Sequence, residues 1–250
     1  MQNTDYFDAP SGRRLAYAKT TGKAPGVVFL GGFMSDMQGT KAIYLEEWAK
    51  RDGRAFLRFD YSGHGESSGE FADGCIGDWA EDAQEAIARL TKGPQVLVGS
   101  SMGGWISLRY ARDFPDRVAG LVTIAAAPDF TEDSMWASFS EEQRQVLMKQ
   151  GKISLPSDYD EPYTITRRLI EDGRNQLVLR APLALNFPVR FLQGTEDADV
   201  DMSVALRLLE HATGPDMELL LVKGADHRFS DKECLKKVEL ALVDVISRAI

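Results

Sequence analysis

The sequence predicts an α/β protein with a doubly wound, mostly parallel sheet. Short apolar runs of strand character alternate with segments of helical spacing along most of the 250 residues. A hydrophobic content of 44% is enough for a core on both faces of such a sheet. The alternation is interrupted once, over about residues 129–186. We therefore expect one domain, residues 1–250, with a single insertion.

The N-terminal part begins with two strand-like segments, Gln2–Asp8 and Arg14–Lys19, around a Pro-Ser-Gly turn, which predicts a hairpin. Gly26–Leu30 is a short apolar run that ends at a pair of glycines, as a buried strand does. Apolar residues then recur at helical spacing over Lys41–Arg51, and a strand pattern follows at Arg54–Phe59.

The middle part continues the same alternation. Ile76–Leu90 has helical spacing, and Gln95–Gly99 is an apolar run that predicts a buried strand. Met102–Asp113 is again helical and stops just before a proline, which cannot continue a helix. Arg117–Ala125 has strand character, so these elements form successive units of a parallel sheet.

The insertion, residues 129–186, carries helical patterns at Glu141–Gln150 and Thr164–Leu177. It leaves the sheet at the carboxyl end of a strand, where ligands bind in open α/β folds. Insertions of this length in compact domains are usually functional, so we expect a helical lid over a binding site. The alternative is a packed helical excursion that never contacts a substrate.

After the insertion the alternation resumes. The expected elements are a strand at Val189–Gln193, a helix at Met202–His211, a strand at Met217–Val222 and a closing helix at Asp231–Ile250.

Composition excludes several classes of protein. A net charge of −9 argues against nucleic acid or an anionic membrane surface as the main partner. Two cysteines, Cys75 and Cys234, make no disulfide framework and indicate a reducing compartment. The first residues are neither basic nor apolar, and no apolar run approaches the roughly 18 residues of a membrane span. We therefore expect a cytoplasmic protein without stable membrane insertion.

The segment from Val96 to Trp105 is an apolar strand, then Gly99-Ser100-Ser101-Met102-Gly103, then the start of a helix. This strand–turn–helix context around G-x-S-x-G resembles the nucleophile elbow of α/β-hydrolases. Small residues two before and two after the serine let strand and helix approach closely. Ser101 is therefore the candidate nucleophile, and an ordinary Gly-Ser loop is the alternative.

A serine hydroxyl needs a base to accept its proton, and in this fold the base follows the nucleophile in the chain. The sequence contains three histidines. His64 precedes the serine, and His211 ends a helix that leads into a strand, at the opposite edge of the sheet. His227 follows the carboxyl end of the strand Met217–Val222 and is the candidate base, the alternative being a surface loop histidine.

The base needs an acid to orient it, and the loop after Val189–Gln193 offers four carboxylates. We assign the role of the acid to Asp197, because it stands three residues after Gly194 and this spacing resembles the acid loop of this fold. Asp199 is the second candidate. Asp201 is expected to cap the following helix.

An oxyanion hole requires two backbone N–H groups. One comes from the residue after the nucleophile, Met102, and the other from the loop after Gly26–Leu30, which we assign to Phe33. The alternative for this second loop is an ordinary Gly-Gly turn.

Together these pieces resemble an α/β-hydrolase-domain serine hydrolase over nearly the whole chain. Four blocks in one order also resemble the branch with palmitoyl-protein thioesterases and acyl-glucuronide esterases. They are Gly32–Ala42, Arg58–Gly63, Val98–Trp105 and Asp226–Arg228, and Leu155–Tyr159 adds a fifth likeness. The resemblance implies hydrolysis of acyl esters and thioesters without a cofactor, and it carries over Ser101, Asp197 and His227 as the triad.

The chain departs from this branch at His64, where an apolar residue is expected. Asp60 and Glu66 lie nearby in sequence, but no second histidine or thiol has metal-ligand spacing. We therefore expect a turn residue near the pocket rim rather than a ligand, and no metal.

Apolar residues of the insertion, chiefly Met135, Trp136 and Phe139, are expected to cover an acyl chain, although most such residues simply pack. Its cations could instead meet a carboxylate such as a glucuronate, or only be solvated; they are Arg144, Lys149, Lys152, Arg167, Arg168 and Arg174.

We therefore expect a serine esterase or thioesterase that acts on a small-molecule or acylated substrate, as a monomer or weak homodimer without nucleic acid. The alternatives are an amidase or C–C bond hydrolase on the same scaffold, and a binding protein that has lost turnover.

Overall fold

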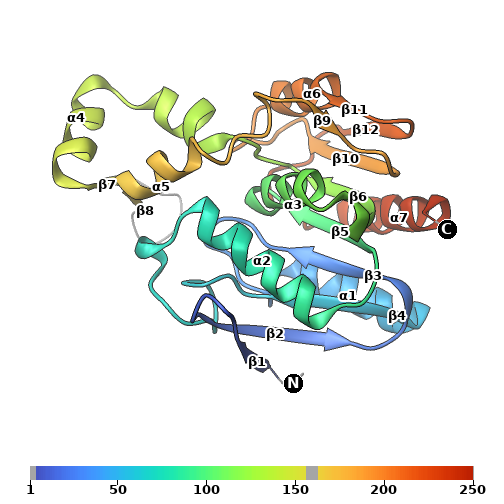
Figure 1. Ribbon diagram of the computed structural model, residues 1–250. Helices are drawn as coiled ribbons and strands as arrows, with labels where there is room; N and C mark the ends of the chain where they lie inside the picture. Colours follow the sequence, from blue (N-terminus) through green and yellow to red (C-terminus); the bar gives the residue numbers. More distant parts are fainter. Residues whose placement is uncertain (1–3, 156–162, 250) are drawn as a thin grey trace.

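A computed structural model describes residues 4–155 and 163–249 of the chain. Its centre is an eight-stranded sheet in the order β1-β2-β4-β3-β5-β6-β10-β12 (Figure 1). The strands are β1 Asp5–Asp8, β2 Arg14–Thr20, β3 Lys23–Leu30, β4 Arg54–Phe59, β5 Gln95–Ser100, β6 Val118–Ile124, β10 Val189–Gly194 and β12 Met217–Val222. In this sheet, β4, β3, β5, β6, β10 and β12 run parallel to one another. Strand β2 pairs with β4 in the antiparallel direction. The predicted mostly parallel sheet and its opening hairpin are confirmed.

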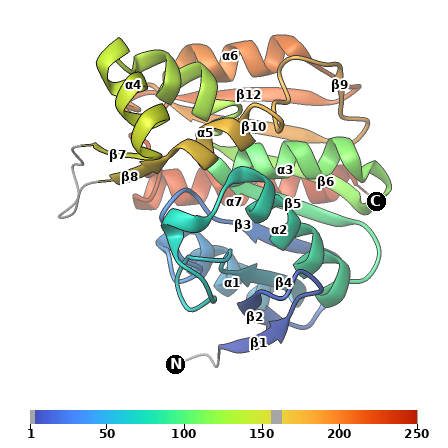
Figure 2. The ribbon, with the colours of Figure 1, turned by 60° about the vertical axis from the view of Figure 1, so that its left-hand side comes forward.

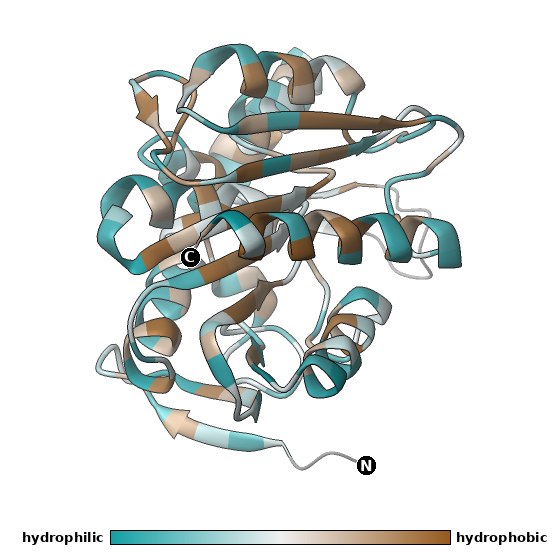
Figure 3. Cartoon of the chain, turned by 90° about the vertical axis from the view of Figure 1, so that its right-hand side faces the viewer, coloured by the Kyte–Doolittle hydropathy of each residue, from teal (hydrophilic) through white to brown (hydrophobic). Residues whose placement is uncertain are grey.

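Helices cover both faces of the sheet. Those that pack on it are α1 Thr40–Asp52, α2 Ile76–Leu90, α3 Met102–Asp113, α6 Met202–His211 and α7 Lys232–Arg248. One core lies under α1 and α7, and the other lies under α2, α3 and α6. Figure 3 shows the sheet strands largely hydrophobic and α7, which ends at the C-terminus, with alternating hydrophobic and hydrophilic turns. The helix periodicity in the sequence thus corresponds to these two buried faces.

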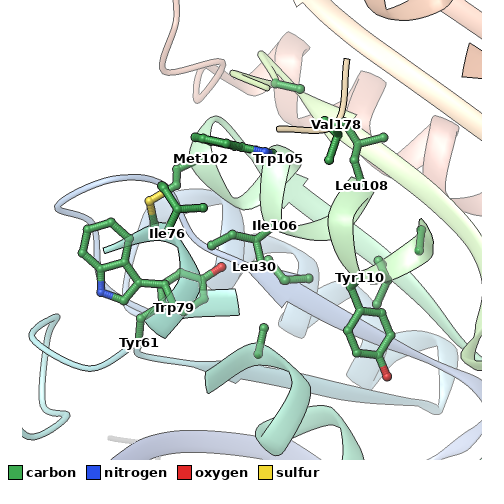
Figure 4. Close-up of a cluster of buried hydrophobic side chains, with 14 of the residues drawn as sticks. Leu30, Tyr61, Ile76, Trp79, Met102, Trp105, Ile106, Leu108, Tyr110 and Val178 are labelled. Atoms are coloured by element: carbon green, nitrogen blue, oxygen red, sulfur yellow. The ribbon is translucent and has the colours of Figure 1, made fainter. Parts of the chain in front are cut away.

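The core beneath α2 and α3 fixes the helix that follows the serine motif (Figure 4). Trp79, Met102 and Trp105 are fully buried there. The two indole N–H groups donate to the carbonyls of Ser62 and Gln176, each over 3.1 Å, so neither is left unpaired. Such a satisfied core holds the start of α3 rigidly against the sheet.

Most predicted elements have the expected bounds, and α2, α3, α6 and β12 match them residue for residue. The helix predicted at Thr164–Leu177 is wrong in its first part. Tyr163–Thr166 is strand β8, antiparallel to β7 Lys152–Leu155, and helix α5 covers only Arg167–Gly173. The β-branched run Thr164–Thr166 favours extended backbone, and the Thr166 side chain caps α5 by accepting from the Leu169 amide.

The insertion lies between β6 and β10 and extends beyond the carboxyl ends of the parallel strands (Figures 1 and 2). It contains a π-helical turn at Thr131–Trp136, helix α4 at Glu141–Gln150, the β7–β8 hairpin and α5. Further along the chain, β9 Leu183–Ala184 pairs with β11 Ala212–Thr213. Of the segment Leu155–Tyr159, only Leu155 is among the described residues. No helix in the described ranges is long and apolar enough to cross a membrane.

Candidate active site

Ser101 occupies the turn between β5 and α3 with φ 53° and ψ −117°, a conformation that side-chain-bearing residues rarely adopt. The glycines around it make the turn possible. A Cβ atom at Gly103 would lie 2.1 Å from the carbonyl oxygen of Leu30, and one at Gly99 would lie 2.4 Å from that of Gly103. The Ser101 amide donates to the Ile124 carbonyl over 2.9 Å, which ties the turn to β6. The strained serine is thus held from both sides.

The imidazole of His227 joins Ser101 to Asp197. Its Nε2 lies 3.1 Å from Ser101 Oγ, and its Nδ1 lies 2.9 and 3.0 Å from the two Asp197 oxygens. The three residues come from loops after β5, β10 and β12 at one edge of the sheet. The structure therefore brings the predicted nucleophile, base and acid into one hydrogen-bonded chain.

Asp197 is held in place by several donors. Its side chain is 1% exposed and accepts from the amides of Asp199 and Val200 at 2.9 and 2.8 Å, and from Gln193 Nε2 at 2.9 Å. Burial raises the pKa of this carboxyl, but the hydrogen bonds from His227 and the Val200 amide outweigh burial and leave the pKa below its usual value. Asp197 is therefore ionised at neutral pH and can fix the imidazole orientation.

The other candidate residues are not part of this hydrogen-bonded chain. Asp199 is 64% exposed, and its carboxylate is 4.0 Å from His227 Nε2, on the serine side of the ring. Asp201 caps α6 by accepting from the Ser203 amide, as predicted. His211 ends α6, and its Nε2 contacts the Ala181 carbonyl at 2.8 Å, away from Ser101.

His64 lies in the turn after β4 but is buried, so the expectation of a residue near the pocket rim is wrong. It is 4% exposed, and its ring lies edge-on to those of Tyr61, Phe71 and Trp79 at 5.1 to 5.6 Å. Burial lowers the pKa of this imidazole. The neutral ring therefore acts as a member of an aromatic cluster.

The two predicted oxyanion donors flank Ser101. Met102 is the first residue of α3, so its N–H has no acceptor within the helix. On the other side, a Cβ atom at Gly32 would lie 3.4 Å from Ser101 Cβ, which places the backbone before Phe33 against the nucleophile. Both N–H groups thus belong to backbone in contact with the serine turn.

Two cavities meet at Ser101, Phe33 and His227. One, of about 280 Å³, is lined mostly by apolar residues. The rest of that wall is Ala127, Phe130, Ser134, Met135, Leu155, Ile165, Asp199 and Val200. The other, of about 180 Å³, is lined by more polar and charged residues, among them Ser35, Asp36, Thr40, Lys41 and Arg228. Ser101 therefore lies between two cavities with different lining residues, which we call the apolar cavity and the polar cavity.

Of the insertion residues expected to contact an acyl chain, Met135 lines the apolar cavity. Trp136 and Phe139 lie outside its wall and pack against each other at 6.2 Å. The Trp136 ring is also covered by the guanidinium groups of Arg144 and Arg174, at 5.1 and 4.7 Å. These cation–π contacts hold the Trp136 ring outside the wall of the apolar cavity.

The arginines of the insertion also have partners within the protein. Arg174 pairs with Glu132 at 2.7 Å and Arg168 with Asp78 at 2.6 Å. Arg144 donates to the Trp136 carbonyl over 3.0 Å. These three cations stabilise the insertion, and none of them lines either cavity at Ser101.

Among the described residues, Asp197, Asp199 and His227 form a group whose ligand atoms lie within 4.8 Å of one another. Both Asp197 oxygens already contact His227 Nδ1, and they also accept backbone and Gln193 donors. The group is therefore better suited to orienting the imidazole than to completing the four ligands of a zinc site.

Two supporting residues were not predicted from the sequence. Gln193, fully buried at the end of β10, holds Asp197 through the hydrogen bond described above. Asp60 accepts from the amides of Met37 at 2.6 Å and Glu66 at 2.9 Å, and so holds the loop that follows Phe33. A polar residue at the end of an apolar strand is the only sequence signal for either of them.

Comparisons with known proteins agree with this geometry. The family profile described as alpha/beta hydrolase fold matches residues 27–192. The mitochondrial palmitoyl-protein thioesterases ABHD10 of Rattus norvegicus and Homo sapiens are each 35% identical over 97% of this chain, which covers 82% and 80% of those proteins. The solved mouse ABHD10 domain has a TM-score of 0.92 at 32% identity, over 99% of this chain and 100% of that one. A protein from Agrobacterium vitis S4 has a TM-score of 0.94 at 36% identity, over 98% of both chains.

These names correct one prediction. The ABHD10 relatives are named as mitochondrial, which overturns the expectation of a cytoplasmic protein. That expectation rested on composition and on the first residues alone, and neither determines the compartment.

Proposed function

The chain belongs to the α/β hydrolase fold family, in the group that includes ABHD10, and from this membership we propose that it hydrolyses carboxylic acyl esters or thioesters through an acyl-serine intermediate. The observation that carries the proposal is the contact of 3.1 Å between Ser101 Oγ and His227 Nε2, with Asp197 on the other ring nitrogen. That chain of contacts is what an activated hydroxyl nucleophile requires.

In the first half of the reaction, Ser101 Oγ attacks the acyl carbonyl carbon while His227 Nε2 accepts the hydroxyl proton. The Asp197 carboxylate stabilises the imidazolium that forms, since its pKa lies below the usual value and it stays ionised. The carbonyl oxygen becomes an oxyanion, which the amides of Phe33 and Met102 stabilise. Each such donor contributes roughly 3 kcal/mol in related sites.

In the second half, the tetrahedral intermediate collapses and the bond to the leaving alcohol or thiol breaks. The His227 imidazolium gives its proton to that leaving group. Water then attacks the acyl-serine, and His227 accepts a proton from it. The carboxylic acid leaves, and Ser101 regains its proton.

The two cavities suggest how the substrate is oriented at Ser101. The wall of the apolar cavity includes Phe130, Met135 and Ile165, so we assign the acyl group to it. The polar cavity, on the other side of Ser101, then receives the leaving group or the attacking water. The insertion supplies part of the apolar wall, and for this reason we assign it the role of a lid.

An alkyl fluorophosphonate probe tests the nucleophile. The wild type and Ser247→Ala, a control far from the site on α7, are expected to be labelled equally, while Ser101→Ala is expected to take up no label. Loss of turnover in Ser101→Ala should exceed roughly 10³-fold. Equal labelling of wild type and Ser101→Ala would refute Ser101 as the nucleophile. No labelling of the wild type would refute the proposal that the protein is a serine hydrolase.

A panel of esters, thioesters and amides with matched acyl groups tests the reaction class. We expect ester and thioester turnover to exceed amide turnover by at least about 10²-fold, because alcohols and thiols leave more readily than amines. A preference for amides would contradict the proposed bond type while leaving the nucleophile intact.

A further inference from the structure

Lys41 connects two parts of the site that are far apart in the sequence. It is the second residue of α1, and its Nζ donates a hydrogen bond to the Arg228 carbonyl, 187 positions later in the chain. The same side chain lines the polar cavity together with Ser101 and His227. A single ammonium group therefore touches the backbone immediately after the candidate base.

The turn that carries His227 is joined to the Asp197 loop by hydrogen bonds, among them one from the Gly224 amide to Thr195 Oγ1. It joins β12 to α7, and Phe229 adopts φ 50° while its ring is fully buried. The Asp226 carboxylate accepts from the Phe229 amide over 3.0 Å, which closes the turn locally. Lys41 adds a hydrogen bond from α1 to this strained turn, beside the packing of Phe229 in the core under α1.

Helix α1 is itself connected to the other half of the site. The loop at residues 31–39, which carries Phe33, leads directly into its first residue, Thr40. Asp60 anchors that loop through the Met37 amide. The contact from Lys41 to the Arg228 carbonyl thus connects the turn that carries His227 with the backbone that flanks Ser101.

The charge of Lys41 has a local explanation. Burial lowers the pKa of its ammonium, while Asp226 raises it and Arg228 lowers it further. Burying a cation is costly unless it is hydrogen-bonded, and the Arg228 carbonyl supplies that bond. An apolar side chain would avoid this cost but would leave the turn without its tether.

We propose that Lys41 is a positioning residue for the hydrolysis assigned above, which holds His227 within reach of Ser101 by binding the Arg228 carbonyl. This inference rests on the proposed function. The apolar cavity, to which the acyl group is assigned, has no contribution from Lys41. Loss of the tether is therefore expected to lower kcat while KM stays nearly constant. A displacement of the base by about 1 Å can cost roughly 10²-fold in rate.

The test compares Lys41→Met, Lys41→Arg and Lys50→Met, the last a control on the same helix whose ammonium pairs with Glu47 at the surface. The Met variant keeps the length of the stem and removes the donor, and we expect kcat to fall 10- to 100-fold with KM changed less than 3-fold. The Arg variant, which can still donate, and the control are expected to stay within about 3-fold of wild type. The low-field proton NMR signal of the His227–Asp197 hydrogen bond should shift or broaden in the Met variant only.

Lys41→Ala offers a second route. Added n-propylamine is expected to restore kcat in a saturable way, since its ammonium can take the place of the lost one. Equal kcat in Lys41→Met and wild type would overturn the proposal, as would an Arg variant no better than the Met variant. Failure of both the Met and Ala variants to fold would also overturn it, because Lys41 would then serve stability. A wild type that does not hydrolyse any ester refutes the proposed function itself, which makes the two failures distinguishable.

Discussion

Replacing Gly103 by alanine tests whether the tight serine turn controls both stability and turnover. The added Cβ would lie 2.1 Å from the Leu30 carbonyl oxygen and 2.5 Å from that of Gly31, whereas real Cβ atoms essentially never approach closer than 3.0 Å. Both neighbours are backbone atoms at the point where β3 ends and the loop to Phe33 begins. The clash can therefore be relieved only by moving that loop, or the start of α3, by about 1 Å.

The expected magnitudes follow from that displacement. Overpacking of this kind costs about 1–3 kcal/mol, against which alanine gains about 1 kcal/mol in helix propensity. A net loss near 1 kcal/mol lowers Tm by roughly 2–4 °C in a chain of this size. Because the oxyanion donors separate from Ser101, kcat is expected to fall about 10²-fold or more.

The matched control is Gly77→Ala, which also adds a methyl group in the first turn of a helix. The atoms nearest to its Cβ would be the ends of the Asp172 and Gln176 side chains, at 2.7 and 2.8 Å, which can move more readily than backbone. Thermal melts and ester kinetics on both variants check the prediction. A Gly103→Ala protein with wild-type kcat and Tm would refute the reasoning that the turn is sterically saturated.

Three further predictions concern the acid, the pH dependence and the acyl side. Asp197→Asn should lower kcat by about 10⁴-fold, while Asp199→Asn stays within about 3-fold; the reverse order in steady-state kinetics would transfer the acid role to Asp199. Burial raises the pKa of Asp60 to about 6 from 3.8, so the folded state binds the extra proton and the free energy of unfolding should fall as pH rises across that window. Asp60→Asn should remove this slope in denaturant titrations, and an unchanged slope would assign it to other groups. Met135→Trp should lower kcat/KM for long acyl chains relative to acetyl by about 10-fold, whereas Trp136→Ala, outside the apolar cavity, should leave that ratio unchanged; equal effects in an acyl-length series would refute the cavity assignment.

The sheet and the candidate triad of Ser101, Asp197 and His227 could be predicted because short sequence patterns indicate them. The serine motif needs glycines at fixed offsets, and chain order together with sheet edge leaves His227 as the base. Asp197 and Asp199 are chemically equivalent in sequence. The structure separates them: Asp197 is buried and contacts His227 Nδ1, and it accepts the amides of residues 199 and 200, whereas Asp199 is exposed.

The insertion could be predicted only in outline, because its side chains contact residues that are distant in the sequence. The sequence predicts that Trp136 contacts the acyl chain. In the structure, Arg174, nearly 40 positions later, covers its ring. Thr164–Thr166 has β-branched residues that favour a strand, yet its pairing with β7 depends on a tertiary contact that periodicity does not report. The role inferred for Lys41 likewise depends on a contact across the fold.

The most direct measurement is mass spectrometry of the enzyme quenched within milliseconds of mixing with an activated acyl ester or thioester. The account predicts a mass increase equal to the acyl group on the peptide that contains Ser101, present in the wild type and lost in Ser101→Ala. Efficient turnover with no acylated peptide, or with the acyl group on a different residue, would contradict it.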